Sequence, residues 1–450
     1  MTLFRKIKTK VKFYLTSFLI KLSLYIKSPK LTSLIFAMIA QKINTQGDFT
    51  VLCLGRSIFS DDIKAMATFG KQIQYRVIHL DYWQIIFDYL TEESERKDLT
   101  EDNYHSDNIL VKGKQDYYCY LQKMFHLLKK LIGFDAVLSG NIGYIVQQEL
   151  AKVCEETKVP FVVLHKEAIV VSDAYKNFLE HYKTRKFVGA KVLFYNEQCM
   201  EGFLDLKIPG LTKDKAFFVG IPRFDCYFSK AKEVDSRGGQ IAFFSFLPQM
   251  SFRFLTKDAE KLKQIEKRAL KFYISVMEFA RKHKDIKVII KTKMAQHYLQ
   301  YPKNILNEHY KEGIDNLVIT NASNSSELIQ NSTAVIGFNS TTLIEAIIAG
   351  KKIISPYFGD IMKDEPWAFF QRHSQLVNYA NSEVDLEKFI FRSSEVDYNP
   401  KIKKDFLEKF VSTSRGGASE RAETAIIEAI DSYRKNHNHN KNNKKHDITS

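Results

Sequence analysis

The sequence is poor in cysteine, and the few cysteines that it has are scattered. Five occur in 450 residues, at Cys53, Cys119, Cys154, Cys199 and Cys226. Their number is odd and no two form a CxxC pair, so the sequence has neither a disulfide framework nor the ligand spacing of a structural zinc site. Dispersed free cysteines indicate a reducing compartment, and the sequence therefore predicts a cytoplasmic protein.

Long uninterrupted hydrophobic runs are missing as well. The most apolar N-terminal stretch is broken by Thr16, Ser17, Lys21 and Ser23. It falls short of the roughly 20 clean apolar residues that a membrane-spanning helix needs. No small-residue cleavage site follows it, which disfavours a secretory signal peptide. An uncleaved signal anchor is the remaining alternative of this kind.

Acidic residues are absent from the start of the chain. Residues 1–30 contain eight lysines and arginines and no aspartate or glutamate, and aromatic and aliphatic residues lie between the basic ones. This basic amphipathic pattern predicts that residues 1–45 form an arm on an anionic membrane surface, so that the protein associates peripherally with the inner face of the cell membrane. The alternative is a helix packed on the first domain with a solvated lysine face.

The whole chain is basic, with a formal net charge of +15 and a pI of about 9.2. Such a charge favours an anionic partner, which can be nucleic acid, a membrane or a phosphorylated small molecule. Much of the excess lies in the N-terminal arm and the tail, and no nucleic-acid-binding module is recognisable, so nucleic acid is disfavoured. GxGxxG and GxxxxGK[ST] motifs are also lacking, which removes support for dinucleotide and P-loop ATP binding.

Short apolar segments alternate with helical segments along most of the chain. Examples are FTVLCLG (49–55), VPFVVLH (159–165), IKVIIKTK (286–293) and TAVIGFNS (333–340). The alternation predicts an α/β protein with two doubly wound, Rossmann-like domains facing a cleft, each built on a parallel sheet covered on both faces. We expect an acceptor domain, a linker, a donor domain and a disordered tail over residues 46–225, 226–240, 241–434 and 435–450.

The segment VIGFNSTTLIEAIIAG (335–350) leads from a predicted buried strand into a predicted helix. Asn339, Ser340 and Thr341 lie at this turn, where amides and hydroxyls meet the positive end of the helix dipole, and the turn therefore predicts a phosphate site. Glu345, one helical turn further on, is a candidate for binding ribose hydroxyls. The alternative is that Ser340 or Asn339 only caps the helix and Gly350 ends it.

Charged residues also follow other predicted strands. Lys291 and Lys293 are placed to neutralise a phosphate, with a solvated basic face as the alternative. His165, Lys166 and Glu167 end the strand VVLH, and one of them can take the proton of an acceptor hydroxyl. We predict Glu167 as this base, His165 as the second choice and Lys166 as a contact for an acid or phosphate. The alternative is that the three residues merely open a surface loop.

Four further residues are candidates for the cleft. Gly140 and Asn141 end a predicted strand where backbone can approach a ligand closely, and Arg56 follows the first strand. Arg223 either reaches the cleft or pairs with Asp225 to hold the hinge. No Asp-x-Asp stands at a strand end, and we predict neither a metal nor a cofactor.

Three segments carry a resemblance to a known family. GFNSTTLIEAIIAGKKIISP (337–356) resembles the donor-nucleotide motif of two-domain glycosyltransferases of the GT-B type, which build bacterial capsules, O-antigens and other surface polysaccharides. VGIPRFD (219–225) resembles the segment that ends the first domain in that group, and VIIKTK (288–293) the basic strand end of the second. The group includes Kdo transferases that use CMP donors and glycerophosphotransferases that use CDP-glycerol.

The resemblance implies a metal-independent transferase that moves a sugar from a nucleotide-activated donor, such as a CMP- or CDP-linked one, to a growing or lipid-linked polysaccharide. Ser340, Thr341 and Glu345 would hold the nucleotide, and Lys291 and Lys293 the leaving phosphate. A UDP-sugar 2-epimerase on the same fold is the closest alternative, although a soluble epimerase has no use for a basic membrane arm. A nucleic-acid-binding protein and an inactive scaffold are further alternatives.

Overall fold

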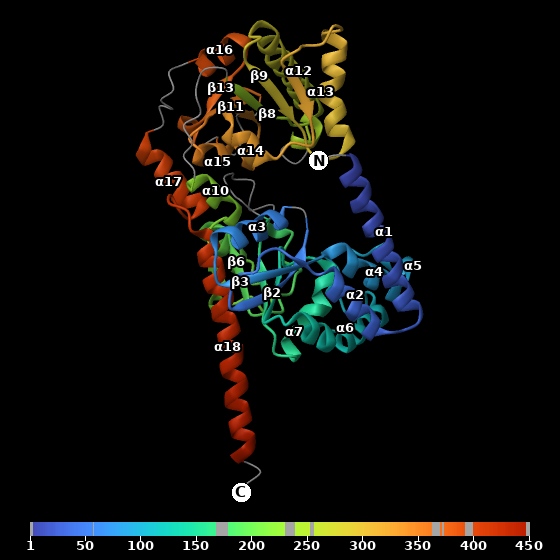
Figure 1. Cartoon of the computed structure of the whole chain (residues 1–450). Coiled ribbons are helices and arrows are strands. Elements are labelled where there is room, and N and C mark those ends of the chain that lie inside the picture. Colours follow the sequence, from blue (N-terminus) through green and yellow to red (C-terminus); the bar gives the residue numbers. More distant parts are fainter. Residues whose placement is uncertain are drawn as a thin grey trace. The chain divides into compact units, whose positions relative to one another are not determined.

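The computed structural model describes residues 3–56, 58–167, 179–229, 239–252, 256–361, 370, 373–391 and 399–446, and side chains for all of these except 3–10, 374 and 436–446. The described residues form two compact units (Figure 1). Unit 1 lies within Met1–Ile169, Lys176–Asp225 and Lys409–Ser450, and unit 2 within Cys226–Glu408. Each unit has its own sheet with helices packed on it, so the predicted α/β class with two Rossmann-like domains is confirmed.

The sheet of unit 1 has seven strands in the order β1-β3-β2-β4-β5-β6-β7. The short β1 pairs antiparallel with β3, and the other neighbours are parallel. The strands are β1 (Gln41–Lys42), β2 (Phe49–Gly55), β3 (Ile73–His79), β4 (Ala136–Ser139), β5 (Phe161–Leu164), β6 (Lys191–Phe194) and β7 (Ala216–Phe218). β4, β5 and β6 are buried along their whole length, as continuous apolar strands between two helix layers should be.

The helices of unit 1 connect these strands and cover the sheet. They are α3 (Phe59–Phe69), α4 (Leu80–Leu90), α5 (Glu93–Arg96), α6 (Val111–Ile132), α7 (Gln148–Glu156), α9 (Glu197–Asp205) and α18 (Ala418–His446), with the short turns η1 (Ile145–Gln147), η2 (Lys213–Lys215) and η3 (Pro222–Phe224). The helix α10 (Asp225–Phe228) begins at the end of unit 1.

The N-terminal segment is part of unit 1. It forms α1 (Leu3–Tyr25) and α2 (Pro29–Ile39), of which α1 packs on α4 and α2 packs on α6 (Figure 1). Phe36 stacks on Trp83 with ring centroids 4.8 Å apart. The N-terminal segment is therefore packed on the first domain, as the alternative reading of the sequence expected. Among the helices that the structure describes, none is long and apolar enough to cross a membrane.

The sheet of unit 2 has six parallel strands in the order β10-β9-β8-β11-β12-β13. They are β8 (Gln240–Phe244), β9 (Lys287–Lys291), β10 (Leu317–Thr320), β11 (Ser332–Gly337), β12 (Lys352–Pro356) and β13 (Asn378–Ala380). The helices are α11 (Pro248–Phe252), α12 (Ala259–Lys282), α13 (Gln296–His309), α14 (Ser325–Gln330), α15 (Thr341–Ile348), α16 (Glu383–Phe391) and α17 (Pro400–Val411), with the turn η4 (Ser374–Leu376).

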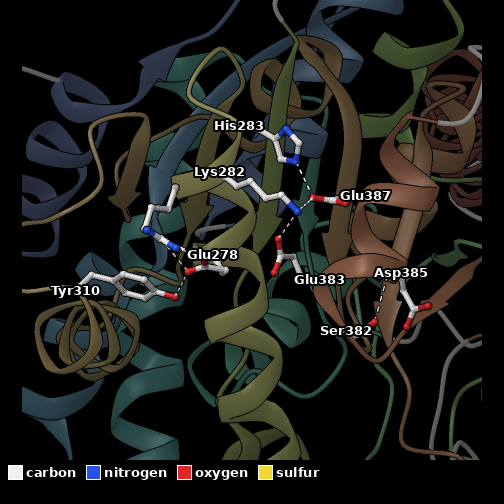
Figure 2. A network of polar contacts seen from close by, with 9 residues as sticks. Glu278, Lys282, His283, Tyr310, Ser382, Glu383, Asp385 and Glu387 are labelled. Atoms are coloured by element: carbon white, nitrogen blue, oxygen red, sulfur yellow. Dashed lines mark hydrogen bonds and ion pairs between the residues drawn. The ribbon is translucent and has the colours of Figure 1, made fainter.

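A network of ion pairs fastens α16 to α12 (Figure 2). The Lys282 ammonium lies 3.3 Å from Glu383 and 2.7 Å from Glu387, and the Nε2 of His283 lies 2.9 Å from Glu387. Because β9 starts a few residues after α12 ends, this network lies at the amino ends of the strands. It is a structural clamp at the end of the sheet opposite to the carboxyl ends of the strands, where parallel α/β sheets as a class bind ligands.

The last helix, α18, packs on α3 of unit 1. Asp225 caps it by accepting hydrogen bonds from the backbone of Ala418 (3.0 Å) and Ser419 (2.7 Å). The prediction that residues up to 434 belong to the second domain therefore needs correction from Lys409 onward, because an amphipathic pattern does not say which core a helix covers. The helix also continues to His446, where a disordered tail was expected from residue 435.

Candidate functional site

Each sheet has a point at which its strand order reverses. In unit 1 the chain runs from β2 outward to β3 and then returns to β4 on the other side of β2. In unit 2 it runs from β8 through β9 to β10 and returns to β11 on the other side of β8. Parallel α/β sheets bind ligands beyond the carboxyl ends of the strands at such reversals. The candidate sites therefore lie beyond β2 and β4 in unit 1 and beyond β8 and β11 in unit 2.

The turn after β11 occupies the reversal point of unit 2. Asn339 has a left-handed backbone with φ of 45°, a conformation that asparagine tolerates better than most residues. Ser340 caps α15, because its Oγ accepts a hydrogen bond from the backbone N of Thr342 at 3.3 Å. The expectation that Ser340 caps this helix is thus confirmed. Thr341 is the first residue of the helix, and the chain brings all three to the position predicted for a phosphate.

Glu345 lies one turn into α15 and is half-buried. The hydroxyl of Tyr227, another residue of unit 2, donates a hydrogen bond to its Oε2 at 2.5 Å. Burial raises the pKa of Tyr227, so its phenol stays protonated and remains the donor. A carboxylate can accept several hydrogen bonds, so this contact orients Glu345 and leaves a ribose-binding role compatible with the geometry.

Lys291 and Lys293 lie at the carboxyl end of β9, next to β8. Lys291 is the register partner of Phe244 at the end of β8, and its Nζ donates to the backbone oxygen of Thr292 at 2.8 Å. Burial lowers the pKa of Lys291. Lys293 is exposed, and its ammonium lies 5.1 Å from the ring centroid of Tyr298.

In unit 1 the reversal point is lined by the residues that follow β2 and β4. The guanidinium of Arg56 lies 4.7 Å from the ring centroid of Tyr144. Gly140 packs so closely that a Cβ there would come within 2.6 Å of the Phe59 ring. Asn141 accepts a hydrogen bond from the backbone of Gly143 at 2.7 Å and so shapes the loop after β4. The structure therefore brings Arg56, Gly140 and Asn141 together.

The three ionisable residues after β5 have different surroundings. His165 is 1% exposed and its ring contacts those of Tyr182, Phe194 and Phe203, at 4.7 Å in the last case. Burial lowers its pKa to about 3, so the imidazole is neutral and enclosed by aromatic rings. This burial disfavours His165 as the second-choice base, a role that stays a prediction.

Lys166 and Glu167 lie closer to solvent and form an ion pair with each other. The Glu167 side chain is 38% exposed, and Lys166 is only 9% exposed. Glu167 can therefore meet an acceptor hydroxyl, although part of its charge is compensated by Lys166.

Glu101, Asp102 and Arg185 join this cluster, and the sequence did not suggest them. The Nη2 of Arg185 lies 3.2 Å from Glu101 Oε2 and 3.0 Å from Asp102 Oδ1. A Cβ on Gly143 would lie 2.9 Å from the same Glu101 oxygen, so the carboxylate lies against the loop after β4. Burial raises the pKa of Glu101, and Arg185 and Arg56 offset this only in part. These residues lie in polar segments that follow no predicted strand, so strand-end patterns could not find them.

Arg223 binds a buried carboxylate of α3. Its Nη1 lies 3.0 Å from Asp62 Oδ2 and donates to the Tyr195 hydroxyl at 2.6 Å. Asp62 is fully buried on α3, and a buried carboxylate needs a cation or hydrogen-bond donors. Arg223 thus ties the end of unit 1 to α3. Its place in the cleft and its pairing with Asp225 stay predictions.

Two kinds of chemistry are therefore placed at the two reversal points. Unit 2 offers a helix N-terminus and two lysines, which suit a phosphate. Unit 1 offers carboxylates, Glu101 and Glu167, beside the cations Arg56, Lys166 and Arg185, which suits a polyhydroxyl ligand and proton transfer from it. Within the described residues, no group of three or more histidines, cysteines or carboxylates is arranged to hold a metal ion.

No protein-family model matches the sequence, and no curated protein matches it significantly. Solved structures do resemble the fold. The UDP-GlcNAc 2-epimerase from Neisseria meningitidis bound to UDP-GlcNAc is 10% identical over 84% of this chain and 99% of its own, with a TM-score of 0.47. The UDP-GlcNAc 2-epimerase from Methanocaldococcus jannaschii is 12% identical over 84% and 98%, with a TM-score of 0.49.

The trehalose-6-phosphate synthase OtsA is 10% identical over 84% of this chain and 99% of its own, with a TM-score of 0.44. At such identities and TM-scores these likenesses assign no function to the chain. Its own strand orders define an α/β protein with two Rossmann-like domains, as in the GT-B fold, and with one candidate site at the reversal point of each sheet.

Proposed function

We propose that the protein is a nucleotide-sugar enzyme, a glycosyltransferase of the GT-B type that moves a sugar from a nucleotide-activated donor to a hydroxyl of a glycan. The observation that carries the proposal is the turn between β11 and α15. It places Asn339, Ser340 and Thr341 at the reversal point of unit 2, with Lys291 and Lys293 following the strand beside β8.

This turn suits the phosphate of a nucleotide donor. The first backbone N–H groups of α15 have no partner within the helix, and the helix dipole adds positive character at that end. Lys291 is partly buried, which costs its charged form free energy that a bound phosphate would offset. Glu345, oriented by Tyr227, can accept ribose hydroxyls one turn deeper.

The cluster in unit 1 suits the acceptor. A hydroxyl that attacks the sugar must lose its proton, and Glu101 and Glu167 are carboxylates with exposed surface at the reversal point. Arg56 and Lys166 can bind further polar groups of the acceptor. We include a growing or lipid-linked surface polysaccharide, such as a capsule, as the acceptor, because the acid-free N-terminal segment favours work at an anionic membrane surface.

The donor site is tested by nucleotide binding. We expect one of the nucleotides CMP, CDP, UDP and GDP to raise the melting temperature of the full chain, because a ligand that binds only the folded state stabilises it. Ser340→Ala should weaken binding of that nucleotide about ten- to hundredfold, since a hydrogen bond to a charged phosphate is worth roughly 1.5–3 kcal/mol. It should weaken the nucleoside much less.

Ser28→Ala is the matched control. Ser28 caps α2 of unit 1 by accepting a hydrogen bond from the backbone N of Leu31 at 3.3 Å, whereas Ser340 belongs to unit 2. Both variants lose a helix cap and about 1 kcal/mol of stability, but only Ser340→Ala should lose nucleotide affinity. Equal affinities in the two variants, or no stabilisation by any nucleotide, would contradict the donor site. Release of an epimerised free sugar in place of transfer would make the enzyme an epimerase.

A further inference from the structure

The helix α1 has two apolar faces, and only one of them is packed. Ile20 and Leu24 are buried on the packed face, together with Thr16 and Ser23. The opposite face, which we call the outer stripe, is between 42% and 75% exposed and consists of Val11, Tyr14, Leu15, Phe18, Leu22 and Tyr25. These positions recur every three or four residues and therefore form one continuous stripe along the helix.

The packed face is fixed by hydroxyl groups. Ser23 bonds to Thr32 of α2 at 2.8 Å, and Thr32 bonds to the Tyr120 hydroxyl of α6 at 2.5 Å. Phe13 contacts the Tyr82 ring of α4 with centroids 5.3 Å apart. Hydrogen-bonded hydroxyls point inward beside Ile20 and Leu24, while the aromatic and aliphatic side chains of the outer stripe point to solvent. The helix is thus a fixed part of unit 1 that presents an apolar surface.

Positive charge borders the outer stripe. At 100° per residue, Lys12 and Lys21 lie on its two edges, and both are exposed, as are Lys27 and Lys30 just beyond the helix. The first acidic residue of the chain is Asp48. An apolar face rimmed by lysines without acids is the pattern of helices that lie in the interface of an anionic bilayer.

We propose that the outer stripe docks on an anionic phospholipid bilayer, with α1 lying in the plane of the interface while its other face stays packed on unit 1. A second copy of the chain fits less well, because two such stripes would bring lysines together with no acid of the segment to pair with them. The inference goes beyond the proposed activity, since it holds whatever reaction the enzyme performs.

The test is co-sedimentation of the full chain with vesicles of phosphatidylcholine containing about 30% phosphatidylglycerol, compared with pure phosphatidylcholine. We expect binding to the anionic vesicles and its weakening at about 1 M salt, where the Debye length falls to about 3 Å. The double variant Phe18→Glu, Leu22→Glu should bind about tenfold less or worse, with an unchanged melting temperature because both side chains are exposed.

Val384→Glu is the control, because Val384 is an exposed apolar residue on α16 of unit 2. Vesicle binding by this variant should equal that of the original chain. Equal binding by the stripe variant and the control would overturn the proposal. So would a chain that binds no vesicles but forms a dimer that the stripe variant dissociates, since the stripe would then be an interface between copies.

Discussion

At the scale of single residues, the end of β5 separates three neighbours that the sequence pattern groups together. His165 lies inside an aromatic cluster, Lys166 is mostly buried, and Glu167 reaches solvent. The neighbouring loop adds Glu101, which Arg185 holds in place from the interior. Because the buried Arg185 orients this carboxylate, we propose Glu101 as the base ahead of Glu167.

We expect Glu101→Gln to lower the transfer rate about 10²- to 10⁴-fold without changing nucleotide-induced stabilisation, because the amide keeps the shape but cannot take a proton. The raised pKa of Glu101 also predicts that the acid limb of the pH–rate profile lies above the usual range of a glutamate. Glu167→Gln is the matched control and should cost less. A larger loss in Glu167→Gln would return the role of base to Glu167, as first predicted.

His165 predicts acid sensitivity. Its pKa is lowered from 6.5 to about 3 by burial, so between these values the unfolded chain binds a proton that the folded chain does not. Stability should therefore fall as the pH falls through this window, by up to about 1.4 kcal/mol per pH unit from this group. His165→Phe fits the aromatic surroundings and should flatten the fall. Urea unfolding followed by circular dichroism between pH 4 and pH 7, roughly the accessible part of the window, checks this; parallel slopes for both proteins would exclude His165 as a cause.

At the scale of elements, the buried carboxylate of Glu423 ties α18 to β3 and to the residues just before that strand. Glu423 accepts hydrogen bonds from the backbone of Lys71 (2.9 Å) and Gln72 (3.0 Å) and from the Tyr75 hydroxyl (3.0 Å). A Cβ on Gly70 would come within 2.2 Å of this carboxyl group, so the glycine makes room for it. The contact joins residues some 350 positions apart in sequence.

Glu423→Ala should destabilise unit 1 by about 3 kcal/mol, because it leaves several buried donors without an acceptor. Glu420→Ala on the exposed side of the same helix is the control and should change stability by less than about 0.5 kcal/mol. Urea unfolding measures both. If the two variants unfold at the same urea concentration, the carboxylate does not hold the helix.

At the scale of the whole molecule, the chain builds most of unit 1, then unit 2, and returns to unit 1 at Lys409. Asp225 is the last residue of unit 1 before the chain enters unit 2, and its side chain also caps α18 after the chain has returned to unit 1. A fragment that ends at Asp225 would lack α18 and leave the donors of Lys71, Gln72 and Tyr75 unpaired. The first domain is therefore not a contiguous stretch of sequence.

Local sequence patterns predict most of the helices and strands, and they predict the edge of each sheet at which the candidate residues lie. Continuous apolar segments such as 49–55 and 333–340 become β2 and β11, and the turn with Ser340 follows, because strand and helix periodicity and capping are local properties. The short strands β1 and β13 carry too little pattern to be predicted.

Long-range packing, in contrast, sets which face of α1 is buried and which unit α18 covers. It also encloses His165 and brings Glu101 beside the loop after β4. Each depends on partners far away in sequence: Tyr120 for the hydroxyls of α1 and α2, Tyr75 for Glu423, and Arg185 for Glu101. Burial, which sets the pKa values of His165 and Glu101, is a property of these long-range contacts. A local sequence pattern therefore cannot predict the burial of these two side chains or their pKa values.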